Sequence, residues 1–308
     1  MRWSIVICSY NRAPDLAEAL ERLRDLRYPE GDFEILVVDN ASTDCTAQVI
    51  RDAAVKSGNL VSVIAEKPGL SFARNLGITA ARGELVAFID DDAWPEPDWL
   101  TALDRGFQQE DVMCVGGKVV AAWPEGAPPS WIPERLHCFF SIVDHGAQRF
   151  LHYPDYPAGT NIAFRKSIFN SLKGFSENLG RIGNCLLSME EVDICLRIEE
   201  VGYKILYRDD ATVHHNIQSH RLTETWLLER ANWQGVSAAV IEIAKFPKRI
   251  ILAKIIKYLF FIVIGVIGNI LLSILQDKKN AFFCRCQTIL CKAYIRQVIG
   301  LAQRREAT

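Results

Sequence analysis

Three consecutive aspartates stand at the end of an apolar segment. Asp90, Asp91 and Asp92 close the predicted strand 84–92, ELVAFIDDD. Adjacent carboxylates repel one another unless a cation compensates them, and hard oxygen ligands suit Mg²⁺ or Mn²⁺. A solvated acidic turn that precedes the next helix is the alternative. The position at a strand end favours a metal site that also holds substrate phosphates.

Two earlier predicted strands also end in polar side chains. Ser9, Tyr10 and Asn11 follow the strand 3–8, and Asp39 ends the strand 33–39. The carboxyl ends of parallel strands share one edge of a sheet, so these residues belong beside the aspartates. A planar base can stack on Tyr10, and Asp39 can accept a hydrogen bond from a base N–H. Ordinary turn chemistry is the alternative for Asn11 and Asp39.

Arg74 follows a loop that contains a glycine, KPGLSFA, and begins a predicted helix. A guanidinium at this position can pair with a phosphate or with one of the aspartates. A solvated arginine on the face of the helix is an equal alternative.

A second acidic cluster opens a predicted helix. Glu190, Glu191 and Asp193 follow Ser188, and Ser188 with Glu191 fits a capping box. A carboxylate at this place can also act as a general base on an alcohol. The sequence leaves both roles open.

Two consecutive histidines, His214 and His215, follow a predicted strand. A histidine beside a carboxylate site can supply a metal ligand or a phosphate contact. We take His214 as the candidate ligand, with a structural or surface role as the alternative.

The elements that must position these residues alternate between strand and helix. This order predicts an α/β fold with a mainly parallel sheet flanked by crossover helices. The apolar strands agree, because both faces of such a sheet are covered. The strands are expected at 3–8, 33–39, 60–66 and 84–92, and the helices from Pro14, from Ser42 or Thr43 to Val55, and over 74–81.

Composition excludes several classes of protein. The 308 residues are 49% hydrophobic and 23% charged, which excludes a disordered chain. Residues 245–308 carry 12 Lys/Arg and 2 Asp/Glu (12 − 2 = +10), and residues 1–244 carry 23 and 35 (23 − 35 = −12). The basic charge surrounds an apolar segment, which suits an anionic membrane surface and not a nucleic acid. Nine cysteines without a CxxC pair indicate a reduced cytoplasmic compartment.

The segment 250–275 is almost wholly apolar, and its core, 258–275, is near the minimum for spanning a bilayer. Lys254 and Lys257 can extend to the interface, and Asn269 is polar. A spanning helix and a helix in the membrane plane both stay open, and a buried core helix is the alternative.

A segment rich in proline and tryptophan, 123–135, is expected to cross the surface over a cleft. Trp123 and Trp131 can stack on a bound ligand or pack as hydrophobic side chains, and packing is favoured slightly.

Five segments together carry a family resemblance, in the order SIVICSYNR, EILVVDNASTD, GLSFARNLGITAARGELVAFIDDDAWPEPDWL, GTNIAFRKSIF, and EEVDICLRIEEVGYKILY with VHH. This order, over about residues 1–216, resembles the family 2 glycosyltransferases, which have the GT-A fold. The resemblance implies inverting, metal-dependent transfer of a sugar from a nucleoside diphosphate donor, UDP- or GDP-linked, to a hydroxyl of a glycan or lipid-linked acceptor.

The resemblance also implies roles for single residues. Contacts to base, ribose and phosphate fall to Ser9, Tyr10, Asn11, Asp39, Arg74, Asp90 and Asp91. The metal falls to Asp92 and Asp90, with His214 as the candidate third ligand. Gly159, Thr160 and Asn161 resemble the loop between donor and acceptor.

The catalytic base is where the chain departs from the family pattern. The family usually has Glu-Asp, and this chain has Glu190-Glu191. Glu191 takes the place of the base, one methylene longer than aspartate, and Asp193 is the reserve candidate.

These inferences divide the chain into two predicted parts. Residues 1–244 form the glycosyltransferase domain, with a nucleotide-sugar half (1–122) and an acceptor half (123–244). Residues 245–308 form a basic tail that holds the enzyme at the cytoplasmic face of a membrane, where polysaccharide or glycolipid is made. The alternative is an inactive nucleotide-binding scaffold at the membrane. A nucleotidyltransferase is disfavoured, because SYNRAP has no glycine to form a phosphate loop.

Overall fold

The computed structural model describes residues 1–183 and 185–306. The contacts divide the chain into two compact units. The sheet unit comprises Met1–Ala122, Ser141–Asn184 and Glu190–Asn216, and the helical unit comprises Trp123–Phe140, Cys185–Met189 and Ile217–Thr308. Each unit is described by itself.

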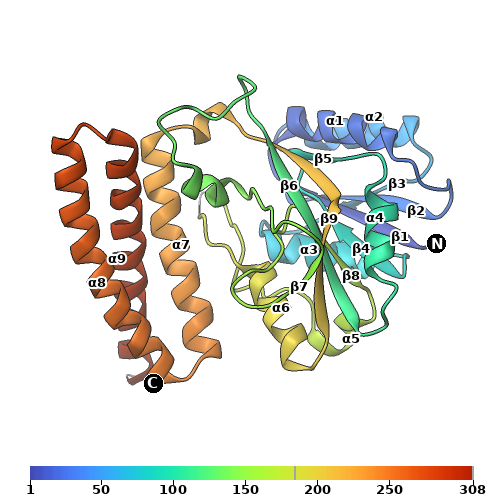
Figure 1. The fold of residues 1–308 in the computed structure, drawn as a ribbon. Helices are drawn as coiled ribbons and strands as arrows, with labels where there is room; N and C mark the ends of the chain where they lie inside the picture. Colours follow the sequence, from blue (N-terminus) through green and yellow to red (C-terminus); the bar gives the residue numbers. More distant parts are fainter. Residues whose placement is uncertain (184, 307–308) are drawn as a thin grey trace. The chain divides into compact units, whose positions relative to one another are not determined.

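The sheet unit is built on a nine-stranded sheet with the order β3-β2-β1-β4-β8-β6-β9-β5, and β7 pairs with β9 (Figure 1). Its strands are β1 (Trp3–Ser9), β2 (Phe33–Asp39), β3 (Leu60–Ile64), β4 (Leu85–Phe88), β5 (Ala93–Pro95), β6 (Val112–Ala122), β7 (Arg149–Leu151), β8 (Ile162–Arg165) and β9 (Lys204–Asn216). Its helices are α1 (Ala13–Arg22), α2 (Thr46–Lys56), α3 (Leu70–Ala80), α4 (Trp99–Gly106), α5 (Ile168–Leu172) and α6 (Glu190–Glu200).

The first half of the sheet is parallel, as the alternation of strand and helix predicts. β1 pairs in parallel with β2 and β4, and β2 pairs in parallel with β3. β8 is antiparallel to β4 and β6, while the long strand β9 runs parallel to β6. The predicted mixed, mainly parallel α/β sheet is confirmed.

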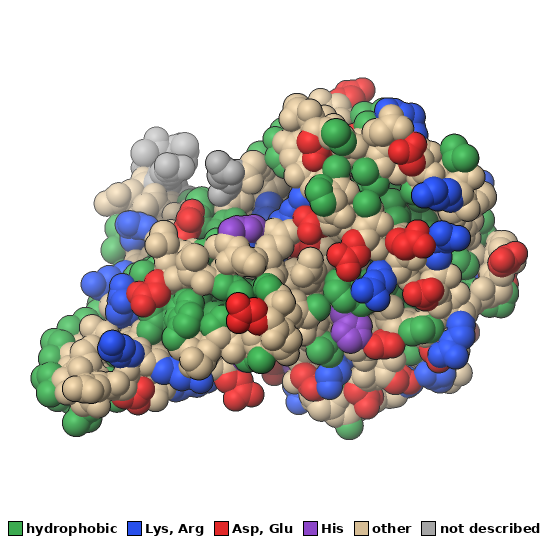
Figure 2. Space-filling model, turned by 90° about the horizontal axis from the view of Figure 1, so that it is seen from above, with side chains coloured by type: hydrophobic (Ala, Val, Ile, Leu, Met, Phe, Trp, Pro, Cys, Tyr) green, Lys and Arg blue, Asp and Glu red, His purple; other side chains and the backbone are tan. Residues whose placement is uncertain are grey.

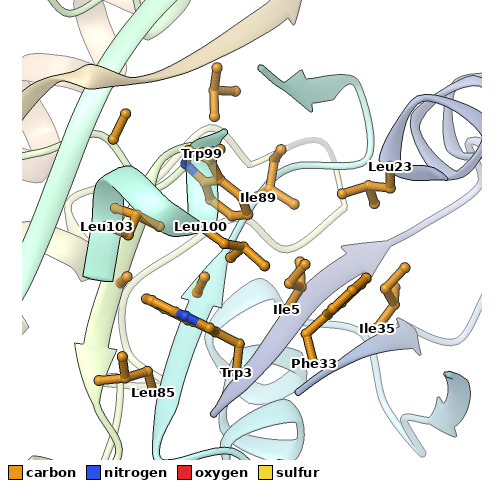
Figure 3. Packing of buried hydrophobic residues seen from close by; sticks show 14 of the residues in the cluster. Trp3, Ile5, Leu23, Phe33, Ile35, Leu85, Ile89, Trp99, Leu100 and Leu103 are labelled. Carbon is orange, nitrogen blue, oxygen red and sulfur yellow. The ribbon is translucent and has the colours of Figure 1, made fainter. Parts of the chain in front are cut away.

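One face of the sheet carries a large apolar core under α1 and α4 (Figure 3). Alternate residues of β1, Trp3, Ile5 and Ile7, point to this face because side chains alternate along a strand. Trp99 and Leu103 of α4 pack there, and both are fully buried. This core holds the carboxyl ends of β1 and β2 in register.

The other face is covered by α3, which approaches β1 closely. A Cβ atom at Gly77 would lie 2.4 Å from Cγ1 of Val6, so only glycine permits this distance. Phe88, Phe164 and Phe175 form edge-on ring contacts on this face, with centroid separations of 5.3–6.1 Å. The close packing holds α3, which carries Arg74, against the sheet.

Three predicted boundaries differ from the structure. β4 ends at Phe88, so Asp90–Asp92 lie in the connection to β5 and not inside the strand. α2 begins at Thr46, whose N–H donates to the Asp44 carboxylate at 2.9 Å, whereas the Ser42 hydroxyl accepts from the Asn11 N–H. β3 is an edge strand, so its side chains are largely exposed rather than covered on both faces.

The helical unit contains α7 (Glu224–Lys245), α8 (Lys248–Ile274) and α9 (Lys278–Glu306), with short 3₁₀ segments before them. The contacts group α7 with the two following helices, whereas the sequence predicts a boundary after residue 244. Trp123 packs against Phe140 and His137, and Trp131 packs against Phe282, as the hydrophobic alternative predicts. Among the described residues, α8 is the helix that is long and apolar enough to cross a membrane.

A buried carboxylate fixes the amino end of the sheet. Glu34 of β2 accepts hydrogen bonds of 2.7 Å from the Ser4 hydroxyl and from the N–H and Nε of Arg82. Burial opposes the charge of Glu34, but these hydrogen bonds outweigh it and hold the pKa of Glu34 below its ordinary value.

The lowered pKa of Glu34 predicts how the difference in free energy of unfolding between wild type and a Glu34 variant depends on pH. A carboxyl with a lower pKa in the folded chain stabilises it above its unfolded pKa, about 4.3, and loses this effect as pH falls through the folded pKa. Glu34→Gln therefore lowers the free energy of unfolding at pH 7, and the difference from wild type shrinks below about pH 4. Denaturant unfolding from pH 7 to pH 3 measures it. A difference that stays constant over this range contradicts the assignment.

Candidate active site

The loops that follow β1, β2 and β4 meet at one edge of the sheet. In the parallel register Ser9 lies opposite Asp39, and Val6 lies opposite Phe88. The connections 10–12, 40–45 and 89–92 therefore leave the sheet on the same side. The sequence prediction that these polar strand ends share one edge agrees with this geometry.

Asp91 and Asp92 are buried at this edge and share one arginine. Nη1 of Arg12 lies 2.6 Å from Oδ2 of Asp92 and 3.2 Å from Oδ1 of Asp91. The Ser9 hydroxyl donates to the other oxygen of Asp91 at 2.7 Å. Burial raises the pKa of Asp91 to about 7, with Arg12 opposing the shift and Asp92 adding to it. One guanidinium thus bridges two buried carboxylates at the carboxyl edge of the sheet.

The histidine at the site is His215 and not His214. His215 Nε2 lies 3.2 Å from Oδ1 of Asp92, and both side chains are buried. His214 stacks on Trp94 and its Nε2 lies 2.5 Å from a Glu96 oxygen. The two histidines are consecutive residues of β9, so they point to opposite faces. The candidate ligand role therefore passes from His214 to its neighbour.

The donor set at Asp92 suits a divalent cation. One carboxylate and one imidazole nitrogen are ligands that Mn²⁺ accepts, and such ions commonly take further oxygens from substrate phosphates. Within the part of the chain that the structure describes, no three His, Cys, Asp or Glu side chains surround one position. Asp92 and His215 fit a metal that depends on substrate for its remaining ligands.

A second buried ion pair lies beside the aspartates. Nη1 of Arg74 donates to Oε1 of Glu190 at 2.7 Å, and Nη2 lies 3.6 Å from Oδ1 of Asp90. Burial opposes the charge of Arg74, but Glu190, Asp90 and Glu191 raise its pKa. The other oxygen of Glu190 is buried without a hydrogen-bond partner among the described residues. The sequence predicts an aspartate or a phosphate as the partner of Arg74, and the structure adds Glu190 of α6.

The segment 159–161 divides into two roles. The Gly159 carbonyl accepts a long hydrogen bond from Arg74, at 3.4 Å, and the Thr160 hydroxyl donates to Oδ2 of Asp90 at 2.5 Å. Asn161 points into the sheet, where its amide bonds Trp99 Nε1 and two backbone carbonyls at 2.8–2.9 Å. Thr160 lies at the site, whereas the Asn161 side chain holds strands together.

The first turn of α6 separates the candidate bases. Asp193 pairs with Arg197 through Nε and Nη2 at 3.0 and 2.9 Å, and Arg197 also bonds the Gly174 carbonyl. Asp193 therefore anchors its own helix. Glu191 is half-buried, and its charge acts on Arg74. The helix begins at Glu190, so Ser188 lies too far upstream to be the N-cap that a capping box requires.

The outer loops of the site are joined to each other. Asn11 Oδ1 accepts from the Thr43 N–H at 2.7 Å, and one oxygen of Asp39 accepts from the Ser42 N–H at 2.9 Å. Tyr10, between these loops, is 39% exposed, which leaves its ring accessible to a planar ligand. Asn11 therefore shapes the loop, and Tyr10 offers the stacking surface.

Sequence reasoning missed Arg12 and His215. Arg12 stands in the same SYNR segment as the selected residues, three positions after Ser9, so its place at the strand end was a usable signal. The choice between the two histidines depends on the register of β9, because alternation places only one of them on the site face.

The fold of the sheet unit, with acidic side chains gathered at the carboxyl edge, is that of a glycosyltransferase of the GT-A type. Two solved structures have this fold, and their low sequence identities to this chain support a shared fold only. A mannosyltransferase from Pyrobaculum calidifontis in complex with GDP-Man and Mn²⁺ has a TM-score of 0.61 and 22% identity, covering 80% of this chain and 65% of that one. S. aureus TarS 1-349 in complex with UDP has a TM-score of 0.55 and 16% identity, covering 98% and 92%.

The chain belongs to glycosyl transferase family 2, whose family model matches residues 4–172. A glucosyl-dolichyl phosphate glucuronosyltransferase of Haloferax volcanii is 29% identical over 247 residues, 79% of this chain and 78% of the relative. A pre-mycofactocin glycosyltransferase of Mycobacterium tuberculosis is 29% identical over 239 residues, and the match spans 46% of its length. The chain is thus an enzyme that transfers sugars.

The buried Arg74–Glu190 pair is expected to couple strongly. Breaking a buried ion pair by removing one partner costs about 3–5 kcal/mol, because the other charge stays uncompensated. Arg74→Met and Glu190→Gln should therefore each destabilise the chain, and the double variant should lose far less than the total of both. Denaturant unfolding of all four proteins gives the coupling free energy.

The exposed pair Lys67–Glu177, at 3.1 Å, provides the matched control. Its coupling is expected at about 0–1 kcal/mol. Additive losses at Arg74 and Glu190 would show that the two charges do not depend on each other.

Proposed function

We propose that the chain transfers a sugar, with inversion, from a UDP- or GDP-linked donor to a hydroxyl of a glycan or lipid-linked acceptor. The observation that carries the proposal is the pairing of Asp92 with His215 at the carboxyl edge of the sheet. It places a carboxylate and an imidazole where ligands of open α/β sheets bind.

The relatives support the classes of donor and acceptor. The Haloferax relative is named for action on a glucosyl-dolichyl phosphate, and the structural neighbours are solved with GDP-Man or UDP. A lipid-linked acceptor also agrees with the apolar α8. We place the reaction at the cytoplasmic face of a membrane, in the assembly of polysaccharide or glycolipid.

Each group of the site has a task in this proposal. The base of the nucleotide stacks on Tyr10, and Asp39 accepts from its N–H. Arg12 and Arg74 provide positive charge beside the diphosphate. Asp92 and His215 would hold Mg²⁺ or Mn²⁺, which when bound neutralises the diphosphate as it leaves.

Glu191 is the proposed base. It follows Glu190, which the ion pair with Arg74 holds in place, and the charge of Glu191 also acts on Arg74. The Glu191 carboxylate takes the proton of the acceptor hydroxyl as the oxygen attacks the anomeric carbon. Attack from the side opposite the leaving diphosphate inverts the configuration. Asp193 is held by Arg197 and serves the helix instead.

The two neighbouring histidines offer a matched test of the metal assignment. Calorimetry of the full chain with UDP and with GDP, each with and without Mn²⁺, should show Mn²⁺-dependent tightening for one nucleotide. His215→Gln should lose at least about tenfold of this tightening, because a first ligand is gone. His214→Gln should keep it. Equal behaviour of the two variants would remove the metal role from His215.

The base assignment is tested by turnover. Glu191→Gln should lower kcat by about 10²–10⁴-fold, the usual contribution of a general base, with nucleotide affinity unchanged. Glu191→Asp, which restores the usual family residue, should retain much of the rate, and Asp193→Asn should retain turnover at temperatures where it stays folded.

The assay uses UDP-glucuronate and GDP-mannose as donors with a glucosyl polyprenyl phosphate acceptor, and NMR of the product reports the anomeric configuration. Retained configuration would refute inversion. Full turnover in Glu191→Gln would show that another group is the general base. Nucleotide binding by wild type without transfer to any acceptor tested would favour the inactive scaffold.

A further inference from the structure

α8 and α9 form an antiparallel pair along most of their length. The rings of Tyr258 and Tyr294 meet at a centroid distance of 4.9 Å near one end. Nearer the other end, a Cβ atom at Gly265 would lie 2.4 Å from Oγ1 of Thr288, so the helix backbones approach closely there. Ile251 and Val298 share one buried cluster, which extends the contact toward the start of α8. α9 therefore accompanies α8 wherever α8 lies.

The accompanying stretch of α9 is cationic. Arg285 pairs with Glu224 of α7 at 2.9 Å, and Arg296 donates to Asn232 of α7 at 3.0 Å. Lys292, between them, is exposed. α9 thus lies between α8 and α7, and it carries these cations on the surface that α8 leaves uncovered.

A spanning orientation of α8 would take these charges into the hydrocarbon. The contact from Tyr258 to Gly265 and beyond covers the middle of α8, which at 27 residues is about 40 Å long. A helix perpendicular to the bilayer would place its middle at the centre, and Arg285, Lys292 and Arg296 would follow. Lysine and arginine side chains at that depth are strongly disfavoured, because the hydrocarbon does not solvate their charge.

The exposed surface of α8 is apolar along most of its length, with Lys257 and Ser273 as exposed polar residues between its two ends. Figure 2 shows hydrophobic side chains along the outer margin of the helical unit, with lysine and arginine side chains beside them. The exposed apolar residues are Ile250, Leu252, Ile256, Leu259, Phe260, Phe261, Val263, Ile264, Val266, Ile267, Ile270, Leu271, Ile274 and Leu275. A contiguous surface of this size marks an interaction site and not ordinary solvent exposure.

Positive charge stands at both ends of this surface. Lys248 and Arg249 begin α8, and Lys278 and Lys279 begin α9 directly after the turn. Each lysine or arginine near an anionic leaflet adds to the electrostatic attraction between the chain and the membrane. Basic residues at both ends of α8 and along α9 are complementary to an anionic lipid surface. All of them can lie near that surface when α8 is parallel to it.

We propose that α8 lies in the plane of an anionic bilayer, with its exposed surface among the acyl chains and with α9 above it at the headgroups. The helix satisfies its own backbone hydrogen bonds, so it can lie in the hydrocarbon boundary without polar partners. The cations of α9 then stay in the aqueous and headgroup region. The inference rests on the proposed membrane attachment and is independent of the sugar chemistry.

Native lysines test the orientation without any substitution. Sealed inverted membrane vesicles that carry the full chain are treated with a membrane-impermeant amine reagent, and modified lysines are identified by mass spectrometry. Modification of Lys56 in α2 identifies the side of the membrane on which the catalytic unit lies. We expect Lys248, Lys278 and Lys279 all to react from the side of Lys56 before detergent is added. A spanning α8 would protect Lys248, or Lys278 with Lys279, until detergent is added, and this result would overturn the proposal.

Attachment itself is measured separately by flotation with phosphatidylglycerol–phosphatidylcholine vesicles. Val263→Glu, at an exposed position in the middle of α8, should lower the bound fraction at least about tenfold. Val55→Glu, on the 90% exposed Val55 of α2, is the matched control and should bind as wild type does.

Two results would overturn the proposal. A wild-type chain that does not float would show that α8 does not bind these lipids. A dimer that forms without lipid and is lost in Val263→Glu would show that α8 binds a second copy of the chain. Nucleotide binding is measured in the same variants and reports whether the catalytic site is intact. A defect of the catalytic site can therefore be distinguished from a loss of membrane attachment.

Discussion

The concentration of negative charge at one sheet edge governs the catalytic unit. Asp90, Asp91, Asp92, Glu190 and Glu191 belong to this edge, and Arg12 and Arg74 are the arginines that compensate them. Carboxylates this close are stable only where cations or hydrogen bonds offset their repulsion. The loop after β1, the helix α3 and the helix α6 are each held to the site by one of these ion pairs. In the proposed function, the same negative charge attracts the divalent ion and, through the ion, the diphosphate.

Much of the fold was predictable from the sequence, because local patterns decide it. The runs that became β1 and β2 are apolar and β-branched, and Asp39 ends its strand as expected. The boundaries that differ are those where tertiary contacts decide the outcome. Ser42 and Asn11 bond each other across two loops, so the first candidate cap of α2 is already used. No single-segment pattern contains such a contact.

The candidate site was predictable to the level of segments more than of atoms. Asp92 stands at the edge as the strand ends indicated, and Arg74 of α3 lies near Asp90, as its pairing with an aspartate predicted. Arg12 was missed because an arginine at the start of a helix has an ordinary solvated alternative. The histidine was placed one residue too early because the register of β9 is set by its pairing with β5 and β6, far away in the sequence. Asn161 shows the converse, since a residue in a suggestive segment bonds the interior of the sheet instead.

The position of β9 has a consequence for the growing chain. Asp92 and His215 are 123 residues apart in sequence (215 − 92), so the second member of the pair leaves the ribosome much later than the first. At about 5–20 residues per second, that interval is roughly 6–25 s. The β1–β4 region can form its parallel pairings early, while the aspartates still lack their imidazole neighbour. The completed pair therefore marks a chain whose whole sheet has assembled, and a truncated translation product carries the acidic edge without it.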